Sequence, residues 1–305
     1  MKHVTYAIIF IAFFFIMLCF PSETLSGATN GLLLWFQIVL PTLLPFLVLT
    51  NFFIQTNSIY YISCLCGTFF QKLFALSPCG TFAALSGFLC GYPIGAKVTA
   101  DLVKTKQISS QEGKYLLSFC NNTSPAFITS YIVLQNFKDK SFMLPTLIIL
   151  YLSPIICSFI FRKYYHISSK NPVQTPLINV KTNLRFEIFD FSIMNAFENI
   201  TKIGGYIILF SILFTFGESL QINYLLPFLE ITNGIPCILD LCSSFEISYI
   251  ITLALTSFGG VCSIVQTCSM LSETELSVYP YVIEKLITAL VTSLLALIYV
   301  FLILR

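Results

Sequence analysis

The chain has 305 residues, of which 56% are hydrophobic and only 10% are charged. Soluble domains carry about a quarter of charged residues, so this composition excludes an ordinary soluble domain and indicates a polytopic membrane protein. The formal net charge of +2 gives no reason to expect a nucleic-acid partner. The chain has only two histidines, and none of its 11 cysteines form a C-x-x-C pair, so a structural zinc site is not expected. We expect no other metal and no cofactor.

The first apolar run follows Lys2 and His3 and extends from Val4 to Phe20. This run is long for the apolar part of a signal peptide, and the stretch Pro21–Ala28 offers only a poor small-x-small cleavage site. We therefore expect a retained membrane anchor over residues 1–26. The alternative is a cleaved signal sequence.

Further apolar runs approach the length that a bilayer demands of a helix. In chain order they are Gly31–Phe53, Lys114–Leu134, Phe142–Phe161, Ile203–Phe216 and Tyr279–Leu304. Two other regions, Cys79–Val98 and Cys237–Met270, carry glycine and polar residues at mid-segment, which is typical of re-entrant hairpins. The sequence therefore predicts an all-α membrane protein with about seven to nine membrane segments.

The region Ser86–Val98 places glycines, a proline and a lysine inside apolar sequence. Gly87, Gly91 and Gly95 recur every fourth residue, so on a helix they form a stripe against which another backbone can pack closely. Pro93 lacks an N–H and leaves the carbonyl four residues earlier without its usual donor. Irregular backbone is tolerated in a membrane only where it is buried in protein or faces a cavity. We therefore predict a glycine-rich hairpin that lines a solute site through Ser86, Gly87, Gly91, Tyr92, Pro93 and Gly95.

Four consecutive polar side chains, Asn121, Asn122, Thr123 and Ser124, interrupt the next apolar run and are followed by Pro125. Amides and hydroxyls offer both donors and acceptors, so this set suits a nucleobase, a sugar hydroxyl or a dehydrated cation. The alternative is a proline-kinked helix whose polar groups bond neighbouring helices. We predict that these five residues bind solute, because they lie a short way from the glycine hairpin in sequence.

Lysine and arginine mark the cytoplasmic side of a membrane protein. Arg162–Arg185 contains five basic residues and no acid, and Lys97–Lys114 contains four lysines against two acids. In the connections Phe216–Pro236 and Ser272–Ser277 every charged residue is acidic. We predict that the N-terminus and the two basic segments, Arg162–Arg185 and Lys97–Lys114, are cytoplasmic. The two acidic connections are predicted to lie outside. The turn Lys138–Lys140 falls outside in this scheme, against the rule.

Beyond the anchor, the chain divides into two similar halves, residues 27–161 and 186–305, around a cytoplasmic basic linker at 162–185. Each half is predicted to contain a span, a hairpin, a charged connection and a final span, and the second half has the opposite orientation. Thr256–Gln266 occupies the hairpin position of the second half. Inverted repeats of this kind are typical of secondary transporters, whose substrate sites lie near the midplane between discontinuous helices.

Three kinds of candidate remain outside these clusters. Lys97 either binds an anionic solute or extends to the cytoplasmic surface. Glu230 and Asn233 belong to an interrupted helix, where an acid accepts a proton or a cation, or else is a solvated loop carboxylate. The candidates of the second hairpin are Ser257, Gly259, Gly260 and Gln266. For the glycines and Gln266 the alternative is close helix packing and a hydrogen bond to a neighbouring helix.

The segments Gly31–Phe46, Ser86–Lys97, Ser118–Pro125, Phe228–Gly234 and Ser257–Gly260 together resemble the sporulation integral membrane proteins of the YlbJ type. That family is grouped with nucleoside-recognition gate domains, which also occur in concentrative nucleoside transporters and in the membrane part of bacterial ferrous-iron permeases. The resemblance implies a bacterial inner-membrane protein of a spore former, needed for spore cortex assembly and built from gate-like repeats. It implies no particular substrate.

These observations together predict a transporter or channel for a small polar solute, nucleoside-like or ionic, with a midplane site between two inverted gate-like repeats. Its partners would be the lipid bilayer, the solute, a coupling cation, and a second copy of the chain or other sporulation membrane proteins. The alternative is a non-transporting scaffold that recruits cortex machinery through its basic segments. No nucleophile elbow, phosphate loop, H-E-x-x-H or paired-carboxylate pattern is visible, so we do not expect an enzyme.

Overall fold

The computed structural model describes residues 2–56, 58, 69–167, 186–222 and 224–304, and in these ranges every regular element is a helix. Five helical stretches are long and apolar enough to cross a membrane: Pro21–Gln55, Lys140–Tyr164, Phe186–Ser219, Phe245–Leu271 and Val278–Ile303. The predicted all-α, multi-pass membrane class is confirmed at this level. Most of the predicted linker, residues 168–185, lies outside the described residues.

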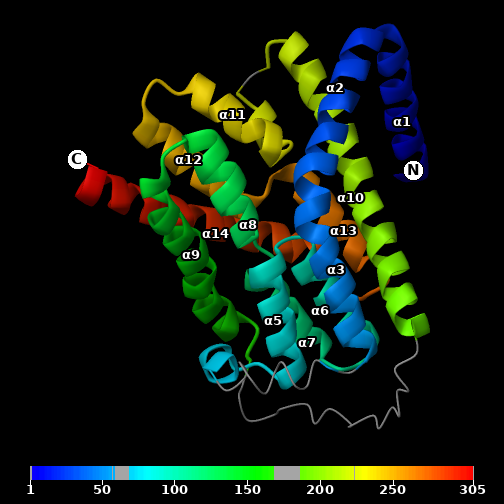
Figure 1. Cartoon of the computed structure of the whole chain (residues 1–305), viewed down its shortest axis with the longest axis vertical. Coiled ribbons are helices and arrows are strands. Elements are labelled where there is room, and N and C mark those ends of the chain that lie inside the picture. Colours follow the sequence, from blue (N-terminus) through cyan, green and yellow to red (C-terminus); the bar gives the residue numbers. More distant parts are fainter. Residues whose placement is uncertain (1, 57, 59–68, 168–185, 223, 305) are drawn as a thin grey trace.

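The N-terminal part consists of two helical rods that lie side by side at one edge of the molecule (Figure 1). The first is α1 (Lys2–Cys19), as the first apolar run predicted. The second is continuous through α2 (Pro21–Leu34), the π-helical η1 (Trp35–Val39) and α3 (Leu40–Gln55). It therefore begins ten residues before the predicted span, because Pro21 starts a helix readily at its first turn.

Two interrupted helices follow. α5 (Pro78–Cys90) and α6 (Ile94–Lys104) are separated by Gly91–Pro93 and pack against each other, so the chain turns back here as predicted, whereas a re-entrant position in the membrane stays a prediction. α7 (Ser110–Cys120) ends before Asn121–Ser124, and the chain continues as α8 (Pro125–Phe127) and the π-helical η2 (Ile128–Phe137). The expected continuous span Lys114–Leu134 is wrong, because the side chains of Asn121 and Thr123 bond other helices and Pro125 has no N–H to continue the helix.

Long helices complete both halves. After η3 (Lys140–Phe142), α9 (Met143–Tyr164) matches the predicted span Phe142–Phe161. α10 (Phe186–Ser219) is more than twice as long as the predicted Ile203–Phe216. Its early turns carry charged residues that lower the hydropathy, and Glu198 and Lys202 pair within the helix at 2.7 Å. The prediction was too short because it included only the apolar part of the helix, and the helix continues through the charged residues before it.

The second half continues with η4 (Leu226–Phe228), α11 (Ile231–Leu241), α12 (Phe245–Phe258), α13 (Gly260–Leu271), α14 (Val278–Tyr299) and the π-helical η5 (Val300–Leu304). The predicted hairpin at Gly259 is wrong. α12 packs mainly on α14 and α11, whereas α13 packs mainly on α6 and α10, so the two helices do not fold back on each other. The chain folds back instead between η4 and α11, at Leu229 and Glu230.

The predicted sidedness of Ser272–Ser277 is also wrong. Lys104 at the end of α6 donates a hydrogen bond to Glu273, so this acidic connection lies at the same end of the molecule as the lysine segment. α14 therefore starts there and ends near the turn after η2, where Tyr299 packs on Tyr249 and Tyr249 on Phe142. The last span was predicted to run toward the end of the molecule with the lysine segment, and in the structure it starts at that end and runs away from it. The acids of this connection compensate nearby lysines rather than marking the opposite side.

Candidate functional site

The interrupted helices of the first half meet at their breaks, which we call the first crossing (Gly91–Pro93 with Asn121–Ser124). The backbone N–H of Tyr92 donates to the carbonyl of Asn122 at 2.6 Å. A Cβ added to Gly87 would lie 2.0 Å from the carbonyl oxygen of Cys120, so only glycine permits this approach. The predicted packing role of the glycine stripe is confirmed, and the two segments meet in space.

Asn121 links this crossing to three other helices. Its Oδ1 accepts from the backbone N–H of Ala96 on α6 at 3.2 Å. Its Nδ2 donates to the hydroxyls of Thr267 on α13 and Tyr281 on α14, at 3.0 and 2.9 Å. The amide is therefore fully engaged in protein contacts, and Asn121 holds the break in place.

Two interrupted helices also meet in the second half, at what we call the second crossing (Leu229–Glu230 with Gly259–Cys262). The backbone N–H of Cys262 donates to the carbonyl of Leu229 at 2.8 Å. The buried carboxylate of Glu230 accepts from the backbone N–H groups of Thr232 and Asn233, both at 3.0 Å, and from the Thr232 hydroxyl. Glu230 is thus the N-cap of α11, where a negative charge is favoured by the helix dipole.

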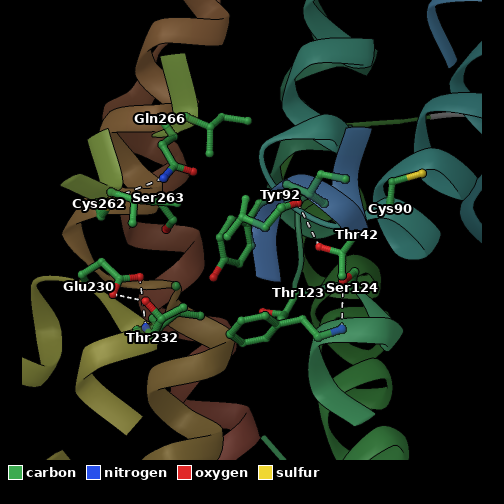
Figure 2. A pocket seen from close by; sticks show the side chains of 17 residues that line it. Thr42, Cys90, Tyr92, Thr123, Ser124, Glu230, Thr232, Cys262, Ser263 and Gln266 are labelled. Atoms are coloured by element: carbon green, nitrogen blue, oxygen red, sulfur yellow. Dashed lines mark hydrogen bonds between the residues drawn. The ribbon is translucent and has the colours of Figure 1, made fainter. Parts of the chain in front are cut away.

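A central cavity of about 60 Å³ lies between the two crossings (Figure 2). Figure 2 shows Glu230, Cys262 and Gln266 of the second half on one side and Thr123 and Ser124 of the first half on the other. The ring of Tyr92 extends between these two sides. The predicted site residues that line the cavity are Tyr92, Thr123, Ser124, Glu230, Gly259 and Gln266. The structure therefore brings together residues from all four helix breaks.

Several lining residues were not predicted. Polar ones are Thr42, Cys90, Thr232, Cys262 and Ser263, and apolar ones are Val39, Leu43, Phe127, Ile203, Ile207 and Ile231. Thr42 lies between two prolines of α3, which was a sequence signal for an irregular, functional part of that helix. Among the described lining residues there is no lysine, arginine, histidine or aspartate, so Glu230 is the one acidic or basic residue at this part of the cavity wall.

The other predicted residues lie near the cavity without lining it. Asn122 donates to the carbonyl of Phe119 at 2.6 Å, and Ser257 accepts from the hydroxyl of Thr292 at 2.9 Å. The candidates that do not line the cavity are Ser86, Gly87, Gly91, Pro93, Gly95, Asn121, Asn122, Pro125, Ser257 and Gly260. Solute binding by these ten residues stays a prediction.

Two clefts flank the central cavity along α10. The upper cleft, of about 700 Å³, is lined by Asn30, Gln37, Gln135, Ser211, Glu218, Asn233 and Asp240, among others, and it shares Thr232 with the cavity. The lower cleft, of about 280 Å³, is lined by Lys97, Asp101, Lys104, Asn195, Glu198, Lys202 and Glu273, among others. Asn233 and Lys97 therefore belong to opposite clefts rather than to the cavity itself.

α14 has a buried polar stripe that was not predicted. Tyr281, Lys285, Thr288 and Thr292 recur at intervals of three or four residues and are all buried, so they share one face of the helix. Glu284 next to this face accepts a hydrogen bond from the Tyr165 hydroxyl. The periodicity of these polar residues inside an apolar run was a readable signal of an inward face.

A comparison with known proteins provides one relative, the sporulation integral membrane protein YlbJ of Bacillus subtilis (strain 168). It is 26% identical over 308 aligned positions, which cover 88% of this chain and 75% of the relative. No family model matches the chain, and no solved structure matches it. The long match agrees with the motifs described above and supports membership of this chain in the YlbJ family of sporulation integral membrane proteins.

Proposed function

We propose that this protein is a transporter for a small polar solute in the bacterial inner membrane, acting in spore cortex formation. The supporting observation is the series of cavities along α10. Asn195–Lys202 lines the lower cleft, Ile203 and Ile207 line the central cavity, and Ser211–Glu218 lines the upper cleft. At 1.5 Å per residue these positions extend over about 35 Å, close to the thickness of a bilayer core.

The order of the elements supports an inverted pair of gate-like repeats. The rod α2–α3 corresponds to α10, the fold-back α5/α6 to η4/α11, the broken helix α7/α8 to α12/α13, and α9 to α14. The two long pairs, α2–α3 with α10 and α9 with α14, pack against each other. α9 ends where α14 has begun, because Tyr165 contacts Glu284, so these two helices run in opposite directions. Rocking one repeat against the other would open the clefts in alternation.

The cavity wall favours an uncharged solute that forms hydrogen bonds. Hydroxyls and the amide of Gln266 offer donors and acceptors, and the aliphatic side chains offer an apolar surface. An anion would be desolvated with no basic partner among the described lining residues, which costs much free energy. The oxygens of Glu230 already accept four hydrogen bonds, which leaves little capacity for a cationic solute. A nucleoside-like molecule fits this chemistry better than a free ion.

The cavity volume supports alternating access rather than an open pore. About 60 Å³ is room for a few water molecules. A nucleoside-sized solute therefore requires the crossings to separate. By the positive-inside rule the end with Arg162 and Lys163 is cytoplasmic, which makes the lower cleft the inner one.

The experiment is a thermal-unfolding screen of the detergent-purified protein with uncharged nucleosides and sugars, dipicolinate and ferrous iron. A ligand that prefers the folded state raises the unfolding temperature in a saturable way. We expect a saturable shift with uncharged solutes that is lost in Thr42→Val. Thr50→Val is the matched control, because both hydroxyls bond a carbonyl four residues earlier on the α2–α3 rod and only Thr42 lines the cavity.

Two results would contradict this proposal. A saturable shift with dipicolinate alone would contradict the inferred solute class. The absence of any shift, together with a sporulation defect on charge reversal of the exposed Lys106 and Lys114, would favour the scaffold function.

A further inference from the structure

Lys285 is a buried lysine about two turns after the start of the membrane-spanning α14. Its relative exposure is 3%, and it forms no ion pair with any carboxylate of the described residues. A buried charge without an ionic partner is costly and is retained where neighbouring groups stabilise it. The groups that stabilise Lys285 therefore indicate its role.

These groups are oxygens of the first crossing. The Nζ atom donates to the backbone carbonyl of Asn121 at 3.0 Å and to Oδ1 of Asn122 at 3.4 Å. α7 ends at Cys120, so the carbonyls at this end lack intrahelical donors and carry the negative pole of the helix dipole. Unwound carbonyls at a half-helix C-terminus are the kind of ligand that coordinates monovalent cations in transporters.

We propose that the Lys285 ammonium group occupies a monovalent-cation site of the first crossing, formed by the Asn121 carbonyl and the Asn122 amide oxygen. The cation at this position is covalently part of the chain, so the crossing closes without a free sodium or potassium ion. This inference deepens the proposed transport function: it replaces a separate coupling cation, at this position, by a tethered one.

The remaining contacts of the crossing agree with this assignment. The side-chain amide of Asn122 donates to the carbonyl of Phe119 at 2.6 Å, which turns its oxygen toward Lys285. The Asn121 side chain is held by Ala96, Thr267 and Tyr281. Both oxygens are therefore fixed by other bonds and stay in place when the lysine is removed.

The test is the unfolding temperature of wild type, Lys285→Ala and Lys97→Ala in detergent at constant ionic strength, with lithium, sodium or potassium chloride against choline chloride. Lys285→Ala is expected to be less stable in choline and to regain stability with at least one small cation, in a saturable manner. Wild type is expected to be indifferent to the cation. Lys97→Ala is the control, because Lys97 pairs with Asp101 at 2.9 Å and lies in the lower cleft.

A second variant, Lys285→Gln, keeps a donor but removes the charge. Equal stability of Lys285→Gln and wild type would show that the charge is irrelevant and would overturn the proposal. So would a Lys285→Ala variant that responds to none of the cations, or a wild type that responds as strongly as the variant. If neither variant folds, a saturable stabilisation of the wild type by sodium, potassium or lithium chloride would still overturn the proposal, because the site would then accept a free cation while Lys285 is present. This test uses no solute, so it is independent of the proposed solute site. A negative result here does not contradict solute binding, and a failure to find a solute does not affect the cation test.

Discussion

The two crossings face the same physical problem and solve it with opposite charges. Each brings together two interrupted helices whose backbone groups need partners inside the membrane. At the first crossing a cation, Lys285, lies at the carbonyl end of α7. At the second an anion, Glu230, lies at the amide end of α11. Each side chain has the charge opposite to the partial charge of the helix end that it contacts. A break inside a membrane is therefore stabilised when the sign of the buried charge matches the helix end exposed at the break.

The crossings also differ in how closely their backbones approach. An added Cβ on Gly87 would lie 2.0 Å from the Cys120 oxygen, whereas one on Gly260 would lie 3.2 Å from the carbonyl oxygen of Phe228. The first crossing therefore depends on the absence of side chains. The second depends more on the hydrogen bonds of Glu230.

The largest effect is expected from breaking the first crossing with Gly87→Leu. The new side chain overlaps backbone atoms that cannot move aside, so the two broken helices separate. We expect little folded protein, measured as yield and monodispersity after detergent extraction. Gly205→Ala is the control, because a Cβ there meets nothing within 4 Å. A monodisperse, stable Gly87→Leu protein would show that the crossing is looser than the structure indicates.

An intermediate effect is expected from the second crossing. Glu230→Ala removes the N-cap of α11 and should cost about 2 kcal/mol of unfolding free energy, with a smaller loss for Glu230→Gln, which keeps one acceptor. Reversible unfolding in denaturant measures both. Ser244→Ala, which removes the half-buried N-cap of α12, is the comparison and should cost less. Equal losses at Glu230 and Ser244 would mean that burial adds nothing to the cap.

The smallest effect on stability is expected where the two halves meet at the lower cleft. Lys104 and Glu273 are both exposed, so replacing either with cysteine should leave the unfolding temperature unchanged. Because Lys104 belongs to the first half and Glu273 to the second, the two positions test whether these parts of the halves lie on the same side of the membrane. In a background without the exposed Cys19 and Cys268, an impermeant thiol reagent should label Lys104→Cys and Glu273→Cys from one side and Asp139→Cys from the other. Labelling of positions 104 and 273 from opposite sides would restore the sidedness that the acids suggested.

The sequence predicted the parts of the fold that depend on local chemistry. The break at Gly91–Pro93 follows from glycine spacing and a missing donor, and the structure has it. The fold-back at Glu230 was placed at Gly259 instead, because both sites carry helix-breaking residues and only tertiary packing shows which pair of helices folds back. Sidedness of Ser272–Ser277 failed for a similar reason, since a charge count does not show which lysine an acid contacts.

The candidate site was predicted in outline. Tyr92, Thr123, Ser124, Glu230 and Gly259 line one cavity, although they come from four separate breaks, and Gln266 of α13 lines it with them. The contribution of α3 and the inward face of α14 were not predicted, because apolar runs of sufficient length were interpreted as plain spans. Counting polar residues at helical spacing within such runs would have revealed Lys285.

The single tryptophan of the chain lies where the two halves meet. Trp35 donates from its indole nitrogen to the carbonyl of Ile200 on α10 at 2.9 Å, and its ring packs on Gly204. Gly204 lies between the cavity-lining Ile203 and Ile207. The protein therefore contains a built-in fluorophore, and any solute that moves α10 relative to α2–α3 should change the colour and intensity of its emission without an added label.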